Sequence, residues 1–213
     1  MKLITKRTIM GIFILTAVAC SNGRNITGNQ DSTSLSDTIV ANSETTRKAH
    51  ADIDATKSDT TGNGRADFNL LGDGTVDLNL QVSFPLLAGR SVAVHIHEHG
   101  DCSDAGKGAH GHWNPTNEAH GKWGASAFHS GDIGNIELDN KGEGSIKLNS
   151  SRWTIGGDEK TNIMNRAIIV HSGVDDFTTQ PTGNAGSHGS IGCATIKGGA
   201  TSSVYEFSFY LTK

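Results

Sequence analysis

Proline is scarce in this chain: three of the 213 residues are proline, whereas 27 are glycine. That balance indicates many glycine-built turns between strands and is not typical of a helical bundle. Positive charge is limited as well, since 18 Lys and Arg stand against 22 Asp and Glu. No basic patch with interleaved aromatic residues occurs, so we expect no nucleic acid among the partners.

Long apolar runs are also missing. The N-terminal apolar stretch, Thr8 to Val18, is about as long as the core of a signal peptide and too short to span a bilayer. It follows a basic start formed by Lys2, Lys6 and Arg7. Residues 1–19 are therefore predicted to be a signal peptide.

The end of this segment, Ala17-Val-Ala-Cys20, admits two interpretations. Ala17 and Ala19 fit the ordinary cleavage site of an exported protein. The same four residues resemble a relaxed bacterial lipobox, in which Cys20 is lipidated and becomes the mature N-terminus, although the usual Leu at the position of Ala17 is absent.

Cysteine is the third scarce residue, with three in the chain. Export leads to an oxidising compartment, where Cys102 and Cys193 can pair. Cys20 would then remain as an odd thiol unless a lipid caps it, which favours the lipobox. We expect an exported periplasmic or cell-envelope protein that a lipid on Cys20 anchors to the membrane, with a soluble exported protein as the alternative.

The rest of the chain divides by composition. Residues 20–47 are rich in Ser, Thr, Asn and Asp with almost no apolar periodicity, which predicts a flexible polar tether. Beyond them apolar and polar residues alternate with a period of two, the pattern of half-buried strands. The segments that we expect to form strands are 49–55, 76–84, 92–97, 135–138, 145–148, 166–171, 193–197 and 204–211.

Short strands with glycine turns, such as Gly72-Asp-Gly74, predict an all-β fold, an antiparallel sandwich or barrel. Two long irregular stretches, 98–131 and 172–192, interrupt the strands, and loops of that length in a compact domain need a reason. Metal ligation together with a disulfide would supply one. Residues 198–213 form a C-terminal extension whose predicted strand covers a sheet edge or joins two copies of the chain in a homodimer.

Histidine gives the strongest functional signal. Seven of the ten histidines lie between His95 and His129, and Asp132 follows the last of them. His95 and His97 lie two apart on a predicted strand, so both imidazoles point to one face, where they are either solvated or bind one ion. Two sets fit known metal chemistry: a copper set of His95, His97, His112 and His171, and a zinc set of His112, His120, His129 and Asp132.

At these positions the sequence resembles the copper/zinc superoxide dismutases, from about Lys48 to Lys197, which we take as the domain 48–197. The Gly-Asp-Cys-Ser run resembles the exported bacterial branch of the family. The matching stretches are His95-Ile-His-Glu, Gly100-Asp-Cys-Ser, Gly111-His-Trp-Asn-Pro, His120-Gly, His129-Ser-Gly-Asp-Ile-Gly-Asn, Ile169-Val-His, Asp175-Asp and Gly183-Asn-Ala-Gly.

The resemblance implies an eight-stranded antiparallel Greek-key β-barrel with long metal-binding and electrostatic loops. It implies one copper and one zinc ion per chain, held by the two sets above, with His112 as the bridging imidazolate and catalytic residue. Asp175 takes the place of the carboxylate that links a copper histidine to a zinc histidine. Cys102 and Cys193 correspond to the intrasubunit disulfide. The remaining histidines, His50, His99, His110 and His188, match no ligand position.

The implied reaction is the dismutation of superoxide to oxygen and hydrogen peroxide, with the proton delivered by the bridging imidazole. The family normally has an anion-guiding arginine a few residues before the second cysteine, but Gly183 to Cys193 contains none, and His188 or Ser190 takes that place. Since steering contributes roughly 10- to 1000-fold to association rates, we expect a slower enzyme. The substitute cations that we consider are a protonated His188, Lys107, Lys122 and Lys160.

Two other hypotheses remain at this point. The missing arginine favours a periplasmic copper- or zinc-binding protein with weak or no dismutase activity. A β-sandwich with incidental histidines is the third interpretation.

Overall fold

The computed structural model describes residues 47–184 and 189–199. The predicted signal peptide, Cys20, nearly all of the tether, His188 and the strand at 204–211 lie outside these residues. Among the described helical segments none is both long and apolar enough to cross a membrane.

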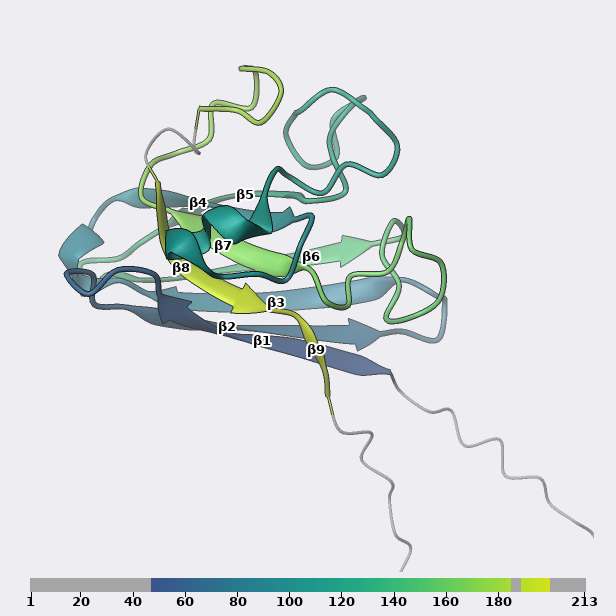
Figure 1. Cartoon of the computed structure of the whole chain (residues 1–213), viewed down its shortest axis with the longest axis horizontal. Helices are drawn as coiled ribbons and strands as arrows, with labels where there is room; N and C mark the ends of the chain where they lie inside the picture. Colours follow the sequence, from purple (N-terminus) through teal and green to yellow (C-terminus); the bar gives the residue numbers. More distant parts are fainter. Residues whose placement is uncertain (1–46, 185–188, 200–213) are drawn as a thin grey trace, which may run out of the picture. The chain divides into compact units, whose positions relative to one another are not determined.

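The described residues form one antiparallel sheet that nearly closes into a barrel (Figure 1). The hydrogen-bonded order is β5-β4-β7-β8-β1-β2-β3-β6, with β9 paired to β1. The all-β prediction is therefore confirmed. The elements are β1 (Lys48–Ala55), β2 (Asn63–Leu70), β3 (Val76–Ser83), the 3-10 turn η1 (Pro85–Leu87), β4 (Ser91–His97), the 3-10 turn η2 (Asp104–Ala109), β5 (Asp132–Glu137), β6 (Glu143–Ser150), β7 (Ala167–His171), β8 (Ser190–Thr195) and β9 (Lys197–Gly198).

Strand β2 is an element that the sequence analysis did not identify. Ala66 and Phe68 are its fully buried residues, and the small Gly64 weakens the alternation that reveals a strand. The glycine has a structural reason, because a Cβ atom there would lie 2.7 Å from the carbonyl oxygen of Gln81 on β3. The close approach of β2 and β3 therefore requires a glycine, and this glycine weakens the apolar alternation by which the strand could have been recognised.

Two predicted strand boundaries are also corrected. β5 begins at Asp132 rather than Asn135, since Asp132 already pairs with His95 across a bulge. β8 begins at Ser190 rather than Cys193, where Ser and Gly give no apolar alternation.

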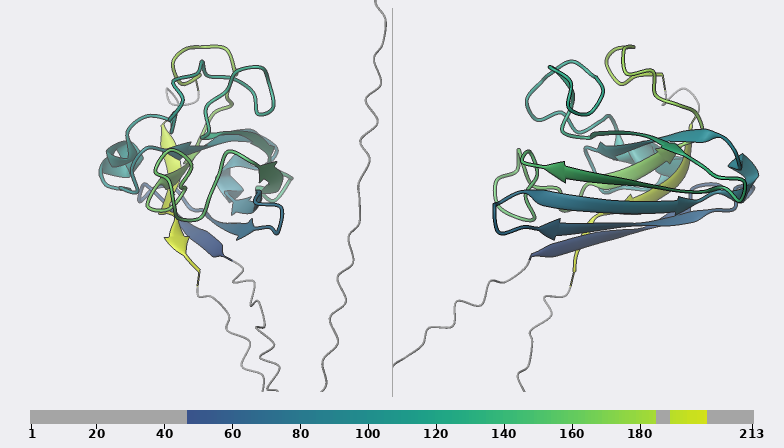
Figure 2. Two further views of the ribbon diagram at one scale, coloured as in Figure 1. Left: turned by 90° about the vertical axis from the view of Figure 1, so that its right-hand side faces the viewer. Right: turned by 180° about the vertical axis from the view of Figure 1, so that it is seen from behind.

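Strand β4 is buried on both faces, and this places the histidines. Val94 and Ile96 belong to the main apolar core, whereas His95 and His97 point to the opposite face. The two long loops, before β5 and before β8, rise on the same side of the barrel, next to β4 and β7 (Figures 1 and 2). Histidines on that face are therefore covered by loops and withdrawn from solvent.

Candidate metal centre

Four buried histidines meet beside β4. Antiparallel pairing sets His171, at the end of β7, opposite Ala93 on β4, and it brings the Nε2 atoms of His171 and His97 to 3.4 Å. His112 reaches the same place through an isolated bridge to His97. One ligand atom from each of His95, His97, His112 and His171 lies within 4.8 Å of the others.

In two of these rings, one nitrogen forms a hydrogen bond with the protein, and this bond selects the tautomer of the ring. The Nδ1 atom of His97 lies 2.8 Å from the carbonyl oxygen of His110, and the Nε2 atom of His95 lies 2.8 Å from the Asp175 carboxylate. Since both oxygens are acceptors, these ring nitrogens carry the protons. The Nε2 of His97 and the Nδ1 of His95 then present lone pairs, which metal binding requires.

A second set is built around Asp132 at the start of β5. Its carboxylate oxygens lie 3.0 Å from the Nδ1 of His112, 3.0 Å from the Nδ1 of His120 and 3.3 Å from the Nδ1 of His129. The backbone N–H of His129 donates to the same carboxylate at 2.8 Å, which fixes its orientation. The buried ligand atoms of His112, His120, His129 and Asp132 also lie within 4.8 Å of one another.

Asp175 links the two sets. One carboxylate oxygen accepts from His95 at 2.8 Å, and the other accepts from His120 at 2.9 Å. Gly183 makes room for this arrangement: its φ is +68°, and a Cβ atom there would clash with the Asp175 carboxylate. The glycine therefore allows the backbone to pass directly over the shared carboxylate.

The electrostatics of the protein groups favour neutral donors on one side and charged carboxylates on the other. Burial, with the nearby charge of His112, lowers the pKa of His95 and of His97 to about 3. Burial raises the pKa of Asp132, but hydrogen bonds from His112, His120 and His129 outweigh it and hold that pKa far below its usual value. Burial lowers the pKa of His120, yet the carboxylates of Asp132 and Asp175 outweigh it and raise this pKa to about 9.

The unmet hydrogen-bonding capacity of a buried ring nitrogen shows that these residues are suited to hold metal ions. The Nδ1 atom of His95 is buried and has no hydrogen-bond partner among the described residues, and the Nδ1 atoms of His120 and His129 face only the carboxylate of Asp132. An unsatisfied buried polar atom costs about 1–3 kcal/mol, so the Nδ1 of His95 calls for a group that the described residues do not supply. Cations bound at these nitrogens would satisfy them, and imidazole with carboxylate is a ligand set suited to copper and zinc.

A disulfide joins Cys102 to Cys193, as the resemblance implies, with their Cα atoms 5.8 Å apart. Cys102 lies in the loop that carries His110 and His112, and Cys193 lies in β8 next to β7. The bond therefore fastens the loop that supplies His112 to the strand beside the one that supplies His171.

A cavity of about 280 Å³ gives access to the first histidine set. Two lysines line it: Lys107, which the sequence analysis considered, and Lys57, which it missed. Lys57 follows Thr56, whose backbone N–H donates to the carbonyl oxygen of Ile191 in β8. Only the β1–β8 pairing brings Lys57 to this place, and no local pattern shows it. The lining residues are Lys57, His97, Ala105, Gly106, Lys107, His110, Gly111, His112, Ile169, His171, Thr182, Gly189 and Ser190.

Two of the other predicted cations do not line this cavity. Neither Lys122 nor Lys160 is among the residues that line this cavity, and His188 lies outside the part of the chain that the structure describes. Ser190, the alternative residue at the position of the missing arginine, does line it. Lys107 is also within 3.3 Å of Asp104, in an exposed pair.

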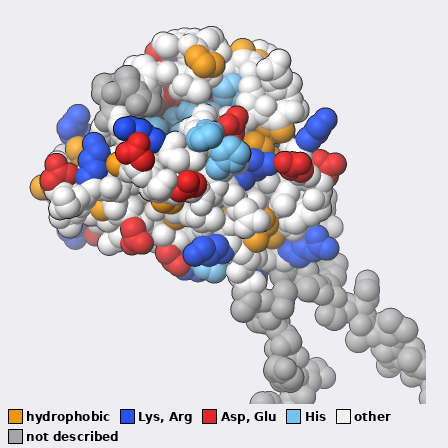
Figure 3. All heavy atoms as spheres, in the orientation of Figure 1, with side chains coloured by type: hydrophobic (Ala, Val, Ile, Leu, Met, Phe, Trp, Pro, Cys, Tyr) orange, Lys and Arg blue, Asp and Glu red, His pale blue; other side chains and the backbone are white. Residues whose placement is uncertain are grey.

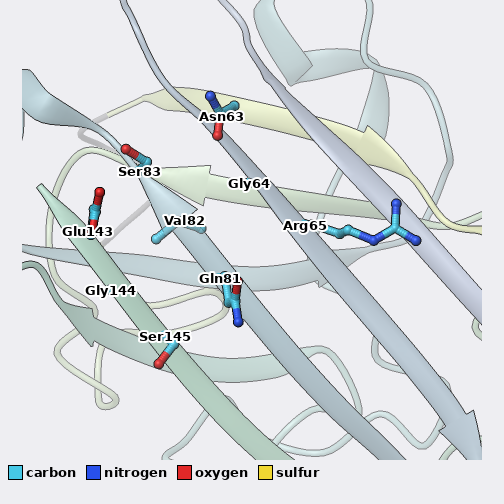
Figure 4. A pocket seen from close by; sticks show the side chains of 9 residues that line it. All are labelled: Asn63, Gly64, Arg65, Gln81, Val82, Ser83, Glu143, Gly144 and Ser145. Atoms are coloured by element: carbon cyan, nitrogen blue, oxygen red, sulfur yellow. The ribbon is translucent and has the colours of Figure 1, made fainter.

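A larger hollow, of about 630 Å³, lies over β2, β3 and β6 and is unrelated to the histidines (Figure 4). Its side chains are spread along three neighbouring strands, and Arg65 points away from the others. It contains no cluster of metal ligands or nucleophiles, so we assign it no chemistry.

Comparison with known proteins agrees with this geometry. Residues 62–196 match the family model described as copper/zinc superoxide dismutase. Superoxide dismutase [Cu-Zn] 2 of Aquifex aeolicus is 33% identical over 70% of this chain and 86% of its own length. The superoxide dismutase-like protein YojM of Bacillus subtilis is 31% identical over 59% of this chain and 65% of its own length. Among solved structures, the clock protein EA4 superposes with a TM-score of 0.61 at 29% identity, covering 72% of this chain and 95% of that one.

Proposed function

Because this chain belongs to the copper/zinc superoxide dismutase family, we propose that it converts superoxide to oxygen and hydrogen peroxide. The observation that carries the proposal is the pair of buried ligand sets that share His112 and are linked by Asp175. A structural polar cluster would need internal partners for all its nitrogens, and this one leaves the Nδ1 of His95 without any among the described residues.

We assign copper to His95, His97, His112 and His171, and zinc to His112, His120, His129 and Asp132. Four nitrogens suit copper, whereas three imidazoles with one carboxylate make a closed set of the kind that zinc occupies. His112 belongs to both sets, which supports its assignment as the bridging residue.

The chemistry that bound copper supplies is one-electron transfer, from one superoxide and then to a second, so that two superoxide ions and two protons give oxygen and hydrogen peroxide. The protein must deliver a proton at that place. His112 is suited to this role, because its Nδ1 faces Asp132 and its Nε2 is left for the copper side, next to the cavity. Burial lowers the pKa of His112, so a proton placed on this ring is readily given up.

Lys57 and Lys107 are proposed to attract the anionic substrate. Both line the cavity that leads to His97, His112 and His171, and the segment 183–193 offers no arginine. Positive charge at the mouth of a low-dielectric cleft raises the local concentration of an anion.

The deciding experiment uses full-length protein reconstituted with one copper and one zinc ion. Superoxide consumption should exceed that of the same amount of copper bound to an unrelated protein by orders of magnitude, and His112→Ala should remove most of it. Equal rates for the reconstituted protein and for that reference would reject the proposal.

The second candidate is a copper- or zinc-binding protein with weak or no dismutase activity. The observation that favours it is the missing arginine between Gly183 and Cys193, together with the relative that is called dismutase-like. Stoichiometric, tight binding of both metals without accelerated superoxide consumption would establish this function instead.

We also propose export, with a lipid on Cys20 that anchors the protein in the cell envelope. The disulfide supports an oxidising compartment, and some similar proteins are named extracellular superoxide dismutases. Export is tested by determining which cell fraction contains the protein. Lipidation is tested by partition into a detergent phase, which Cys20→Ala should abolish. A soluble mature protein beginning after Ala19 would contradict the anchor.

Homodimer formation through residues 198–213 stays a prediction, testable by sedimentation of a chain that ends at Lys197.

A further inference from the structure

A third group of metal-binding side chains lies at the surface, outside both buried sets. One ligand atom from each of Glu98, His99 and His110 lies within 4.8 Å of the others, and all three residues are exposed. The rings of His99 and His110 have their centroids 4.7 Å apart at an interplanar angle of 83°. In Figure 3 histidine side chains gather at the surface in the middle of the face, beside a hollow in which more histidine is visible.

The backbone holds this group in place although its side chains are exposed. Past the end of β4, the N–H of Glu98 donates to the carbonyl oxygen of Gly111 and the N–H of His99 donates to that of Ala109. Arg166, whose guanidinium lies 4.1 Å from the Trp113 ring centroid, donates to the carbonyl oxygen of Glu98. Two chain segments thus run side by side at a fixed spacing and carry the three side chains between them.

His110 has a backbone conformation that a non-glycine residue rarely adopts. Its φ and ψ are 63° and −141°, a region that is strained for any residue with a Cβ atom. Glycine would remove this strain. A histidine here therefore suggests that its imidazole has a use.

His110 also connects the surface group to the buried copper set. It lines the cavity of His97, His112 and His171, and its carbonyl oxygen accepts the hydrogen bond from His97. An ion held by the surface group would sit at the rim of this cavity.

From these observations we propose that Glu98, His99 and His110 form a third metal site, which binds a divalent transition-metal ion such as Zn²⁺ or Cu²⁺ at the rim of the copper cavity. Two imidazoles and one carboxylate are ligands that such ions prefer, and the open side leaves positions for water. Because the side chains are exposed, small rotamer changes suffice to bring the ligand atoms to bonding distance. The site needs no redox step and does not depend on the proposed dismutation.

The test is calorimetric titration of Zn²⁺ into full-length protein whose two buried sites have already been filled with copper and zinc. We expect one further equivalent to bind more weakly than the first two. His99→Gln should weaken this binding by at least the roughly 10- to 100-fold that losing a ligand's supporting partner costs. The matched control is His50→Gln, on β1, which should leave the third equivalent unchanged.

A second variant separates binding from folding. His110→Gly removes the imidazole, keeps the carbonyl oxygen that His97 uses, and relieves the strained conformation, so it should lose the third equivalent while its midpoint of thermal unfolding does not fall. Either the absence of a third equivalent in the unmodified protein or its retention in both His99→Gln and His110→Gly would overturn the proposal. Neither result would affect the two buried ions, so the proposed dismutase function would stand.

Discussion

The Nε2 atom of His95 lies 2.8 Å from the carboxylate of Asp175, 80 positions further along the chain. Both side chains are buried, at 0% and 1% exposure. The other oxygen of the same carboxylate accepts from His120. One side chain therefore sets the ring orientation in both ligand sets.

The first prediction concerns this shared carboxylate. In Asp175→Asn the amide retains one acceptor oxygen, so one of the two histidine N–H groups faces an N–H instead. We expect metal affinity to fall by about 10- to 100-fold, as is usual when a ligand loses its supporting partner. Competition with a chelator measures it for copper and for zinc. Asp176→Asn, at the half-buried neighbouring position, is the control, and equal affinities for the two variants would contradict the shared role.

The second prediction concerns substrate attraction. Lys57→Gln with Lys107→Gln should lower kcat/KM for superoxide by about 3- to 10-fold at low salt, because two positive charges leave the cavity. The loss should shrink as ionic strength rises, since salt screens these charges at the cavity mouth. Lys122→Gln with Lys160→Gln, which change the net charge equally but do not line the cavity, form the matched control. A similar loss in both double variants would point to net charge alone.

The third prediction concerns the disulfide. The two cysteines are 91 positions apart, and closing a loop of that length stabilises the folded state by about 4.6 kcal/mol in the chain-entropy description. Cys102→Ser should reduce the free energy of unfolding of the metal-free protein by about 2–5 kcal/mol, measured in urea. Cys193→Ser should behave alike, and reductant should add nothing to either variant. An unchanged midpoint would show that the bond closes the loop without stabilising the fold.

The fourth prediction concerns the contact between the core and the segment that we propose to bind zinc. The fully buried Trp153 donates from its indole nitrogen to the carbonyl oxygen of Ser130 at 2.7 Å, next to His129. Trp153→Phe leaves that carbonyl without its donor, which should cost at least about 1–3 kcal/mol of stability. Zinc should also be lost faster to a chelator. Trp123→Phe, in the same aromatic group but only partly buried, should have the smaller effect on both measurements.

Much of the site could be predicted because its ligands occur in short stretches with fixed spacing. His95 and His97 share a face by strand periodicity alone, and the segment from His112 to Asp132 contributes one complete set. His171 was included in the copper set although it lies far from the other histidines in the sequence, and its position depends on the pairing of β7 with β4. The fold class followed from alternation, which was strong in β3 and weak in β2, where glycine and alanine replace larger residues.

What the sequence concealed depends on pairing between distant segments. Lys57 reaches the cavity because β1 lies beside β8, a neighbour relationship that no local pattern reveals. His99 and His110 match no ligand position of the family. Both residues are exposed, and the pairing of their two backbone segments brings their ligand atoms within 4.8 Å of each other. Contacts that depend on backbone pairing are therefore the part that composition and spacing miss.

The ligands assigned to copper come from β4, from the loop before β5 and from the end of β7, which meet only when the sheet has been assembled. Pairing over such sequence distances forms late compared with local turns. A chain in which β7 has not yet joined β4 holds at most part of the copper set, and its affinity for the ion is correspondingly low. Copper content would thus separate finished molecules from incomplete ones, and the ion would act as a marker of completed folding.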